Sequence, residues 1–256
     1  MIDMKTFVNE ERRKLLDGKD GIKEAIITRP TKGQTVAIGL LAMEDVGQSK
    51  EWFDALTDEW IHTIDVRWNG SYKKEPRQSA QMGPWNECID GIYNAVLGKS
   101  TVEEVAEEVN ERATAAFIDD LENRSLAHRI DLARALSSYL LDTRTVEEHA
   151  TALENAVKEQ DKPWAVARYL PYVRVLRGLN STGVSEVKAG IEGLLKFHRD
   201  HVASARDADA VQKAVALDAT AMLALARREG MAITVEDELI PDALNDDEHY
   251  PVGNGR

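Results

Sequence analysis

Two pairs of side chains have spacings that could bind a metal ion on one helix face. Glu59 and His62 have the Glu-x-x-His spacing of carboxylate-bridged di-iron helical bundles. That site needs a second such pair, and the sequence contains none. His198 and His201 lie three residues apart, but their helix has no further acidic residue placed to complete a ligand set. The sequence therefore predicts neither a metal centre nor a cofactor.

Motifs for nucleophilic or phosphate chemistry are also missing from the sequence. It contains no Gly-x-Ser-x-Gly, no His-Glu-x-x-His and no phosphate-binding Gly-x-x-x-x-Gly-Lys-Ser/Thr. The single cysteine, Cys88, shares an apolar face with Trp85, Ile89 and Ile92, which predicts a buried, unreactive thiol. We therefore predict that the protein is not an enzyme. A site assembled from scattered acids and histidines is the remaining enzymatic alternative.

One carboxylate occupies a position where an apolar side chain is expected. Asp218 lies on the inward stripe of an apolar helix, with Val215, Ala221 and Met222. A buried carboxylate must be paired or hydrogen-bonded. We interpret Asp218 as one half of a structural pair with a partner such as arginine, with a catalytic role as the alternative.

The composition is that of an acidic, helix-rich globular protein. The chain has 256 residues, of which 43% are hydrophobic and 30% charged, and only 7 are prolines. The net charge of −13 argues against general binding to nucleic acids or to anionic membranes. Two interpretations of this charge stay open: solubility, including in a salty habitat, or attraction of a basic partner.

No segment of the sequence predicts export or membrane insertion. The N-terminus lacks the apolar stretch of a signal peptide. The longest apolar run, residues 36–43, is far shorter than the roughly 20 residues that a membrane span requires. A single cysteine excludes an internal disulfide. We therefore expect a cytoplasmic protein.

Apolar positions with helical spacing predict an all-α protein of about ten helices. Residues 1–244 are expected to form one helical domain, and residues 245–256 a polar, flexible tail. Ser49 is expected to cap one helix, and Pro84 to begin another. Predicted helices cover 3–16, 31–46, 49–68, 84–98, 101–116, 125–141, 145–157, 163–179, 185–202 and 207–228. A strand is the alternative at 31–46, where Val36 and Ile38 alternate, and a short segment at 22–28 ends before Arg29-Pro30.

Two further features suggest how these helices are organised. The similar segments that begin at Thr101 and Thr145 lie 44 residues apart, a spacing near that of HEAT-type repeats. Repeat-like packing of helical pairs is therefore an alternative that the sequence leaves open. The long loop at residues 70–83 is locally basic, and loops of this length are functional or mobile.

The C-terminal segment from Asp207 to Leu244 is the most unusual part of the chain. Its first part predicts one long helix that is apolar almost all round and therefore buried. Gly230 is suited to the left-handed stop of that helix. Ile233 and Val235 then alternate with polar residues, which predicts a short extended strip.

This segment resembles the C-terminal signature of the immunity protein 49 family. The similar pieces are the helix end Leu225-Ala226-Arg227-Arg228-Glu229-Gly230, the strip Ile233-Thr234-Val235, Leu239-Ile240-Pro241, and the upstream Phe197-His198-Arg199-Asp200. The resemblance is confined to the C-terminal end of the chain. It implies a helical protein that protects bacteria, and some archaea, from secreted polymorphic toxins.

The resemblance implies a non-catalytic protein that binds a cognate toxin and blocks its active site or an essential surface. We expect that toxin to be basic, because the chain is acidic. The predicted interface comprises Glu236, Asp237 and Glu238, with Tyr72 and Lys73 of the long loop as a second choice. The alternative function is a helical-repeat scaffold that binds a peptide or protein unrelated to toxins.

Overall fold

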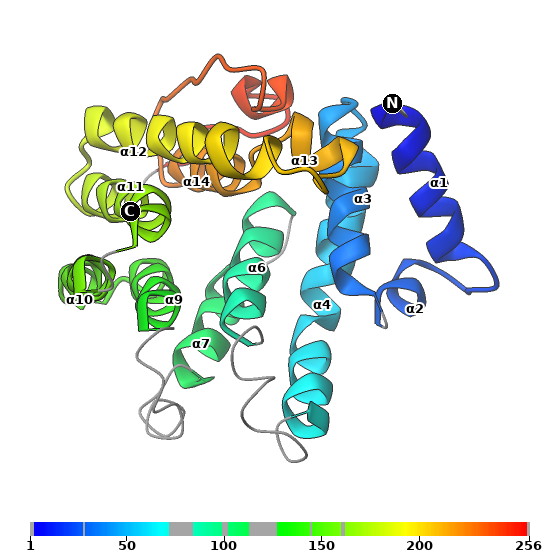
Figure 1. Ribbon diagram of the computed structural model, residues 1–256, viewed down its shortest axis with the longest axis horizontal. Coiled ribbons are helices and arrows are strands. Elements are labelled where there is room, and N and C mark those ends of the chain that lie inside the picture. Colours follow the sequence, from blue (N-terminus) through cyan, green and yellow to red (C-terminus); the bar gives the residue numbers. More distant parts are fainter. Residues whose placement is uncertain are drawn as a thin grey trace.

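The computed structural model describes residues 3–27, 29–71, 84–98, 102–112, 127–143, 145–159 and 162–254. Within these ranges every regular element is a helix, which confirms the all-α prediction (Figure 1). None of the helices in these ranges is long and apolar enough to cross a membrane.

Within the described residues the chain forms twelve α-helices. They are α1 (Met4–Leu16), α2 (Ile22–Ile27), α3 (Pro30–Ala42), α4 (Val46–Ser71), α6 (Pro84–Leu97), α7 (Val102–Arg112), α9 (Ala127–Leu140), α10 (Val146–Glu159), α11 (Pro163–Asn180), α12 (Val184–Phe197), α13 (Ala210–Ala214) and α14 (Leu217–Arg228). A π-helical turn, η2 (His198–Ala203), extends α12, and a 3-10 turn, η3 (Asp242–Asn245), follows the C-terminal strip.

Local signals in the sequence explain several of the helix starts. Asp3 caps α1 by accepting a hydrogen bond from the backbone N–H of Thr6 at 2.9 Å. Proline occupies the first helical position of α3, α6 and α11, where its missing N–H costs nothing. Ser49, however, is not a cap. It lies inside α4, and its buried hydroxyl donates to the carbonyl of Ala37 at 2.8 Å, which joins α4 to α3.

The helices form a row of packed neighbours (Figure 1). Helices α1 to α4 occupy one end, and α9 to α12 the other, with α6 and α7 between them. In the second group α9 packs on α10, α10 on α11 and α11 on α12. Gly190 of α12 allows the closest of these contacts, because a Cβ there would lie 2.7 Å from the carbonyl oxygen of Pro171 in α11.

The predicted long helix at 207–228 is wrong in one respect: it is two helices. The chain leaves helical geometry at Val215, whose φ and ψ are −136° and 125°. The N–H of Ala216 then donates to the carbonyl of Leu239 at 2.9 Å, in place of an intrahelical bond. Because both residues at the break are apolar, the periodic pattern continues across it. The second helix, α14, is buried from Ala219 to Arg227, as its composition predicts.

The strip after α14 is extended, as predicted, and forms no strand within the described part of the chain. Ile233 and Val235 are buried, whereas Thr234 and Glu236 are exposed. The side chain of Asn245 replaces a neighbouring strand: it accepts from the N–H of Val235 at 3.1 Å and donates to its carbonyl at 3.0 Å. An amide side chain therefore satisfies the backbone of the strip.

The residues predicted to form a flexible tail are described as far as Asn254, and they pack on the helices. Tyr250 is 7% exposed, and its hydroxyl donates to the carbonyl of Leu97 at 2.9 Å. The ammonium of Lys50 donates to the carbonyl of His249 and lies 4.2 Å from the centre of the Tyr250 ring. These contacts attach the tail to α4 and α6, helices far from it in the sequence.

Candidate partner-binding surface

The three acids predicted to bind a partner have different surroundings. Glu236 and Glu238 are exposed on the strip. Asp237 is half-buried: its carboxylate pairs with the guanidinium of Arg199 at 2.5 Å and accepts from the N–H of Leu239 at 3.0 Å. Asp237 therefore fixes the strip to η2, and only the other two carboxylates point into solvent.

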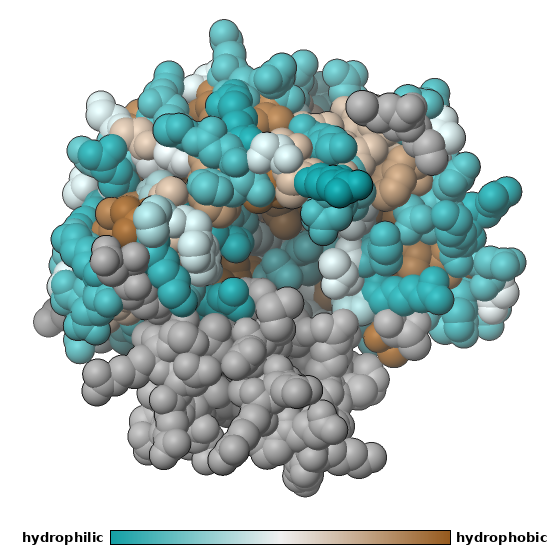
Figure 2. Space-filling model, in the orientation of Figure 1, coloured by the Kyte–Doolittle hydropathy of each residue, from teal (hydrophilic) through white to brown (hydrophobic). Residues whose placement is uncertain are grey.

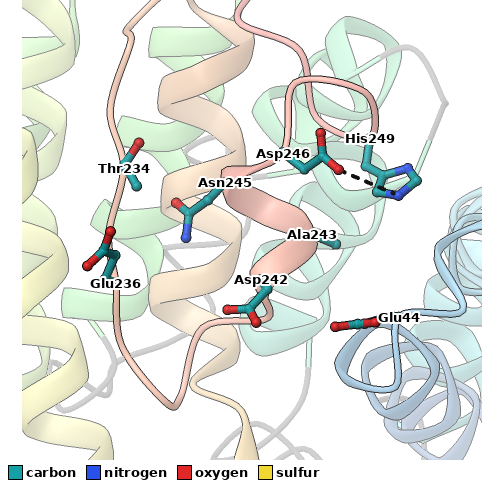
Figure 3. A pocket seen from close by; sticks show the side chains of 8 residues that line it. All are labelled: Glu44, Thr234, Glu236, Asp242, Ala243, Asn245, Asp246 and His249. Atoms are coloured by element: carbon teal, nitrogen blue, oxygen red, sulfur yellow. Dashed lines mark ion pairs between the residues drawn. The ribbon is translucent and has the colours of Figure 1, made fainter.

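Two adjoining hollows, with volumes of about 660 and 510 Å³, are both lined by Glu236, and the smaller one is also lined by Glu238. Both hollows are also lined by Glu44, from the turn after α3, and by Asp242, from η3. The larger one reaches Asp246 and His249 in the tail (Figure 3). We call Glu44, Glu236, Glu238, Asp242 and Asp246 the acidic surface.

Most of the acidic surface is available to a partner. Glu44, Glu236, Glu238 and Asp242 make no side-chain hydrogen bond and no ion pair with other described residues. Asp246 lies 3.9 Å from the imidazole of His249. Elsewhere many acids are paired, as Glu154 is with Arg177 at 2.9 Å. Unpaired carboxylates around a hollow can accept lysine or arginine side chains from another protein.

Glu44 has an uncommon backbone conformation. Its φ is 62°, in the left-handed region that glycine usually occupies after a helix. The N–H groups of Glu44 and Asp45 donate to the carbonyls of Leu41 and Leu40, and so complete the end of α3. Asp142 and Thr182 have the same left-handed conformation after α9 and α11, so this turn is a recurring way of ending a helix in the protein. Nothing in the sequence indicates the φ of Glu44 or its place beside the strip.

Asp218 is half-buried and has the partner that the sequence predicts. Its carboxylate lies 3.2 Å from the guanidinium of Arg168 in α11, and this charge raises the pKa of Arg168. Tyr93 and Tyr172, whose hydroxyls bond to each other, lie nearby. Burial, followed by the Asp218 charge, raises the pKa of both phenols. The cluster therefore keeps an ion pair beside two neutral tyrosines, an arrangement suited to joining α6, α11 and α14.

The predicted histidine pair does not form a joint site. His198 is buried, and its Nε2 lies 2.7 Å from the carbonyl oxygen of Gln212, whereas His201 is exposed. In the part of the chain that the structure describes, no three His, Cys, Asp or Glu side chains are placed to hold a metal ion. Cys88 is buried, as predicted. The side chain of His62, and residues Tyr72 and Lys73, lie outside the described residues.

Few large apolar residues are exposed in the part of the chain that the structure describes. The face seen in Figure 2 is mostly hydrophilic, with apolar side chains in small separate groups. Among the described large apolar residues, the exposed ones are Ile27, Trp164 and Val184, which lie on different helices. Scattered exposure of this kind is normal for a globular protein.

Comparison with protein families shows which family the chain belongs to. The family described as immunity protein 49 matches residues 84–244. The chain belongs to the immunity protein 49 family. Searches of curated proteins and of solved structures found no match. The immunity protein 49 match runs from α6 to η3 and includes Glu236, Glu238 and Asp242, whereas Glu44 and Asp246 lie outside it.

Proposed function

We propose that the protein neutralises a cognate polymorphic toxin by binding it directly, without catalysing a reaction. Membership of the immunity protein 49 family carries this proposal. The acidic surface supports it, because a protein partner can pair with its unpaired carboxylates. The toxin's basic side chains would enter the hollows beside Glu44, Glu236 and Asp242.

The mechanism is occlusion. A stable protein complex buries about 800 Å² of surface on each partner, so the contact must extend beyond the side chains that line the two hollows. The toxin would therefore cover the acidic surface and the helices around it, and its active site or another essential surface would be blocked. The net charge of −13 would accelerate the encounter with a basic toxin. Tyr72 and Lys73 remain predicted as a second contact, and the cytoplasm as the place of neutralisation.

The successive packing of α9 to α12 favours one alternative, a helical scaffold that binds a peptide or protein unrelated to toxins. The two functions differ in where the partner lies. A toxin bound at the acidic surface protects the strip and the tail, whereas a scaffold ligand protects the faces of α9 to α12. Hydrogen exchange in the complex separates these outcomes.

The proposal is tested by co-expression with the toxin encoded beside the gene. Growth rescue together with co-purification is expected, and the absence of both with every neighbouring or related toxin would contradict the proposal. A variant with Glu236→Gln and Glu238→Gln is expected to rescue growth less well. The matched control carries Glu186→Gln and Glu192→Gln, which remove two exposed carboxylates from α12. Equal loss in both variants would show that total charge, and not this surface, matters.

A further inference from the structure

Arg227, in the last turn of α14, is one of the few buried charged residues, with 3% of its side chain exposed. Its Nε donates to the carbonyl of Tyr250 at 2.9 Å, and its Nη1 to the carbonyl of Ile233 at 3.0 Å. Its Nη2 pairs with the carboxylate of Asp247. One guanidinium therefore holds both the strip and the tail against the end of α14.

The backbone of the same residue adds a further contact. The carbonyl of Arg227 accepts from the N–H of Gly253 at 2.8 Å. The tail approaches so closely here that a Cβ on Gly253 would lie 1.9 Å from the carbonyl oxygen of Arg228. Arg228 itself is exposed, and its guanidinium lies 3.7 Å from Glu103. Adjacent arginines therefore have different environments.

Arginine suits this position for a geometric reason. Its planar guanidinium presents five N–H donors in fixed directions, so it can bond several acceptors at once. The carbonyls of Ile233 and Tyr250 belong to buried residues of irregular chain, and such groups require a donor. A lysine keeps the charge, but its single ammonium cannot point toward all three acceptors.

We propose that Arg227 is the positioning residue of the acidic surface. The strip that it binds at Ile233 continues to Glu236 and Glu238, and the tail that it binds at Asp247 and Tyr250 begins beside Asp246. Arg227 is buried, so it sets the relative placement of these carboxylates without contacting the toxin. This inference rests on the proposed function, because it assigns a role in toxin binding.

The test compares Arg227→Lys with Arg228→Lys, the same substitution at the exposed neighbour. Hydrogen exchange in peptides covering 231–238 and 246–253 is expected to accelerate about tenfold or more in the first variant alone, because local opening becomes easier. Peptides from α11 and α12 should be unchanged. Gly253→Ala, which disturbs the tail but keeps the guanidinium, should accelerate exchange in 246–253.

Binding is measured with the toxin encoded beside the gene, well below the unfolding temperature. Arg227→Lys is expected to weaken affinity about tenfold and to reduce the salt dependence of the association rate, because displaced carboxylates steer less effectively. Loss of folded protein alone would lower the active fraction and leave that salt dependence intact. Combining Arg227→Lys with Glu236→Gln and Glu238→Gln should reduce the binding free energy by less than the sum of the separate reductions.

The outcomes separate the role of Arg227 from the proposed function. Unchanged exchange in Arg227→Lys overturns the inference, as does faster exchange with unchanged affinity and salt dependence. In both cases the proposed function survives if the wild-type protein binds. A wild-type protein that binds no toxin removes the proposed function, and the role of Arg227 in binding with it.

Discussion

The helical stack α9–α12 and the C-terminal strip are both packed on the core, but different forces hold them. In the stack, α11 packs on α12, and buried Val175, Leu176 and Ile191 belong to the apolar core. In the strip, Ile233 and Val235 are also buried, yet their backbone groups need Arg227 and Asn245. Helices satisfy their own backbone, so apolar contact suffices to pack them, whereas an extended segment depends on side chains from elsewhere.

The first prediction concerns the apolar packing of the stack and has the largest expected effect. Leu176→Ala in α11 should lower the free energy of unfolding by about 2–5 kcal/mol, because Leu176 is fully buried and the variant leaves a cavity. Denaturant unfolding followed by circular dichroism measures this change. Leu170→Ala, at a partly buried position of the same helix, is the control and should cost less.

Toxin binding by the folded fraction of Leu176→Ala should equal that of the wild type, because no residue of α9 to α12 lines either hollow of the acidic surface. A lower affinity at full folding would mean that the stack takes part in binding, and would favour the scaffold alternative.

The second prediction concerns the side-chain hydrogen bonds that hold the strip. Asn245→Asp replaces the donor to the carbonyl of Val235 with a carboxylate oxygen. The free energy of unfolding at pH 7 should fall by about 1–3 kcal/mol, because a buried acceptor loses its hydrogen bond. Thermal and denaturant unfolding measure it.

Asn155→Asp, at an exposed position of α10, is the matched control and should change stability by less than about 0.5 kcal/mol. Near pH 3, where the new carboxyl is protonated and can donate, the deficit of Asn245→Asp should shrink. A deficit that is the same at both pH values would contradict the lost-donor explanation.

The third prediction concerns ionisation in the stack. Burial raises the pKa of Asp131 to about 6 and lowers that of His128 to about 4. For Asp131 the folded pKa lies above the unfolded value, so its contribution to stability is lost as pH rises from about 4 to 6. For His128 the folded pKa lies below the unfolded value, so its contribution is lost as pH falls from about 6.5 to 4. The two effects oppose each other.

Asp131→Asn should therefore be more stable than the wild type at pH 7 and should lose stability more steeply on acidification from pH 6 to 4. Denaturant midpoints across this range measure both effects. A pH profile parallel to that of the wild type would show that Asp131 titrates normally. Asp142→Asn, which removes an exposed carboxylate just after α9, is the control.

The same comparison explains what could be predicted from the sequence. Helices, their proline starts and the arginine partner of Asp218 follow from spacing and from the need to pair an inward-facing charge, which are local or general properties. The break at Val215 and the packed tail depend on hydrogen bonds to Leu239 and Arg227, whose positions only the folded chain determines. The prediction of Glu236 and Glu238 rests on the resemblance, which points to the strip. Glu44 comes to lie beside them only through tertiary structure, so no sequence pattern points to it.

The fourth prediction has the smallest expected effect and concerns the backbone strain at Glu44. Glu44→Gly removes a carboxylate and places glycine at a φ of 62°, where a Cβ is unfavourable. Stability should rise by at most about 1 kcal/mol, because the relief of strain is partly offset by the greater entropy of glycine in the unfolded chain. Glu44→Gln keeps the strain and removes the charge.

Both Glu44 variants should bind the toxin more weakly than the wild type and to similar extents, because both lack the carboxylate, while only Glu44→Gly gains stability. Calorimetric unfolding and binding kinetics measure the two properties separately. If Glu44→Gly gains stability and both variants bind like the wild type, Glu44 is strained for a reason other than toxin binding, and the acidic surface is confined to the strip and the tail. If Glu44→Gln alone keeps affinity, the toxin requires the polar side chain of residue 44 and not its charge.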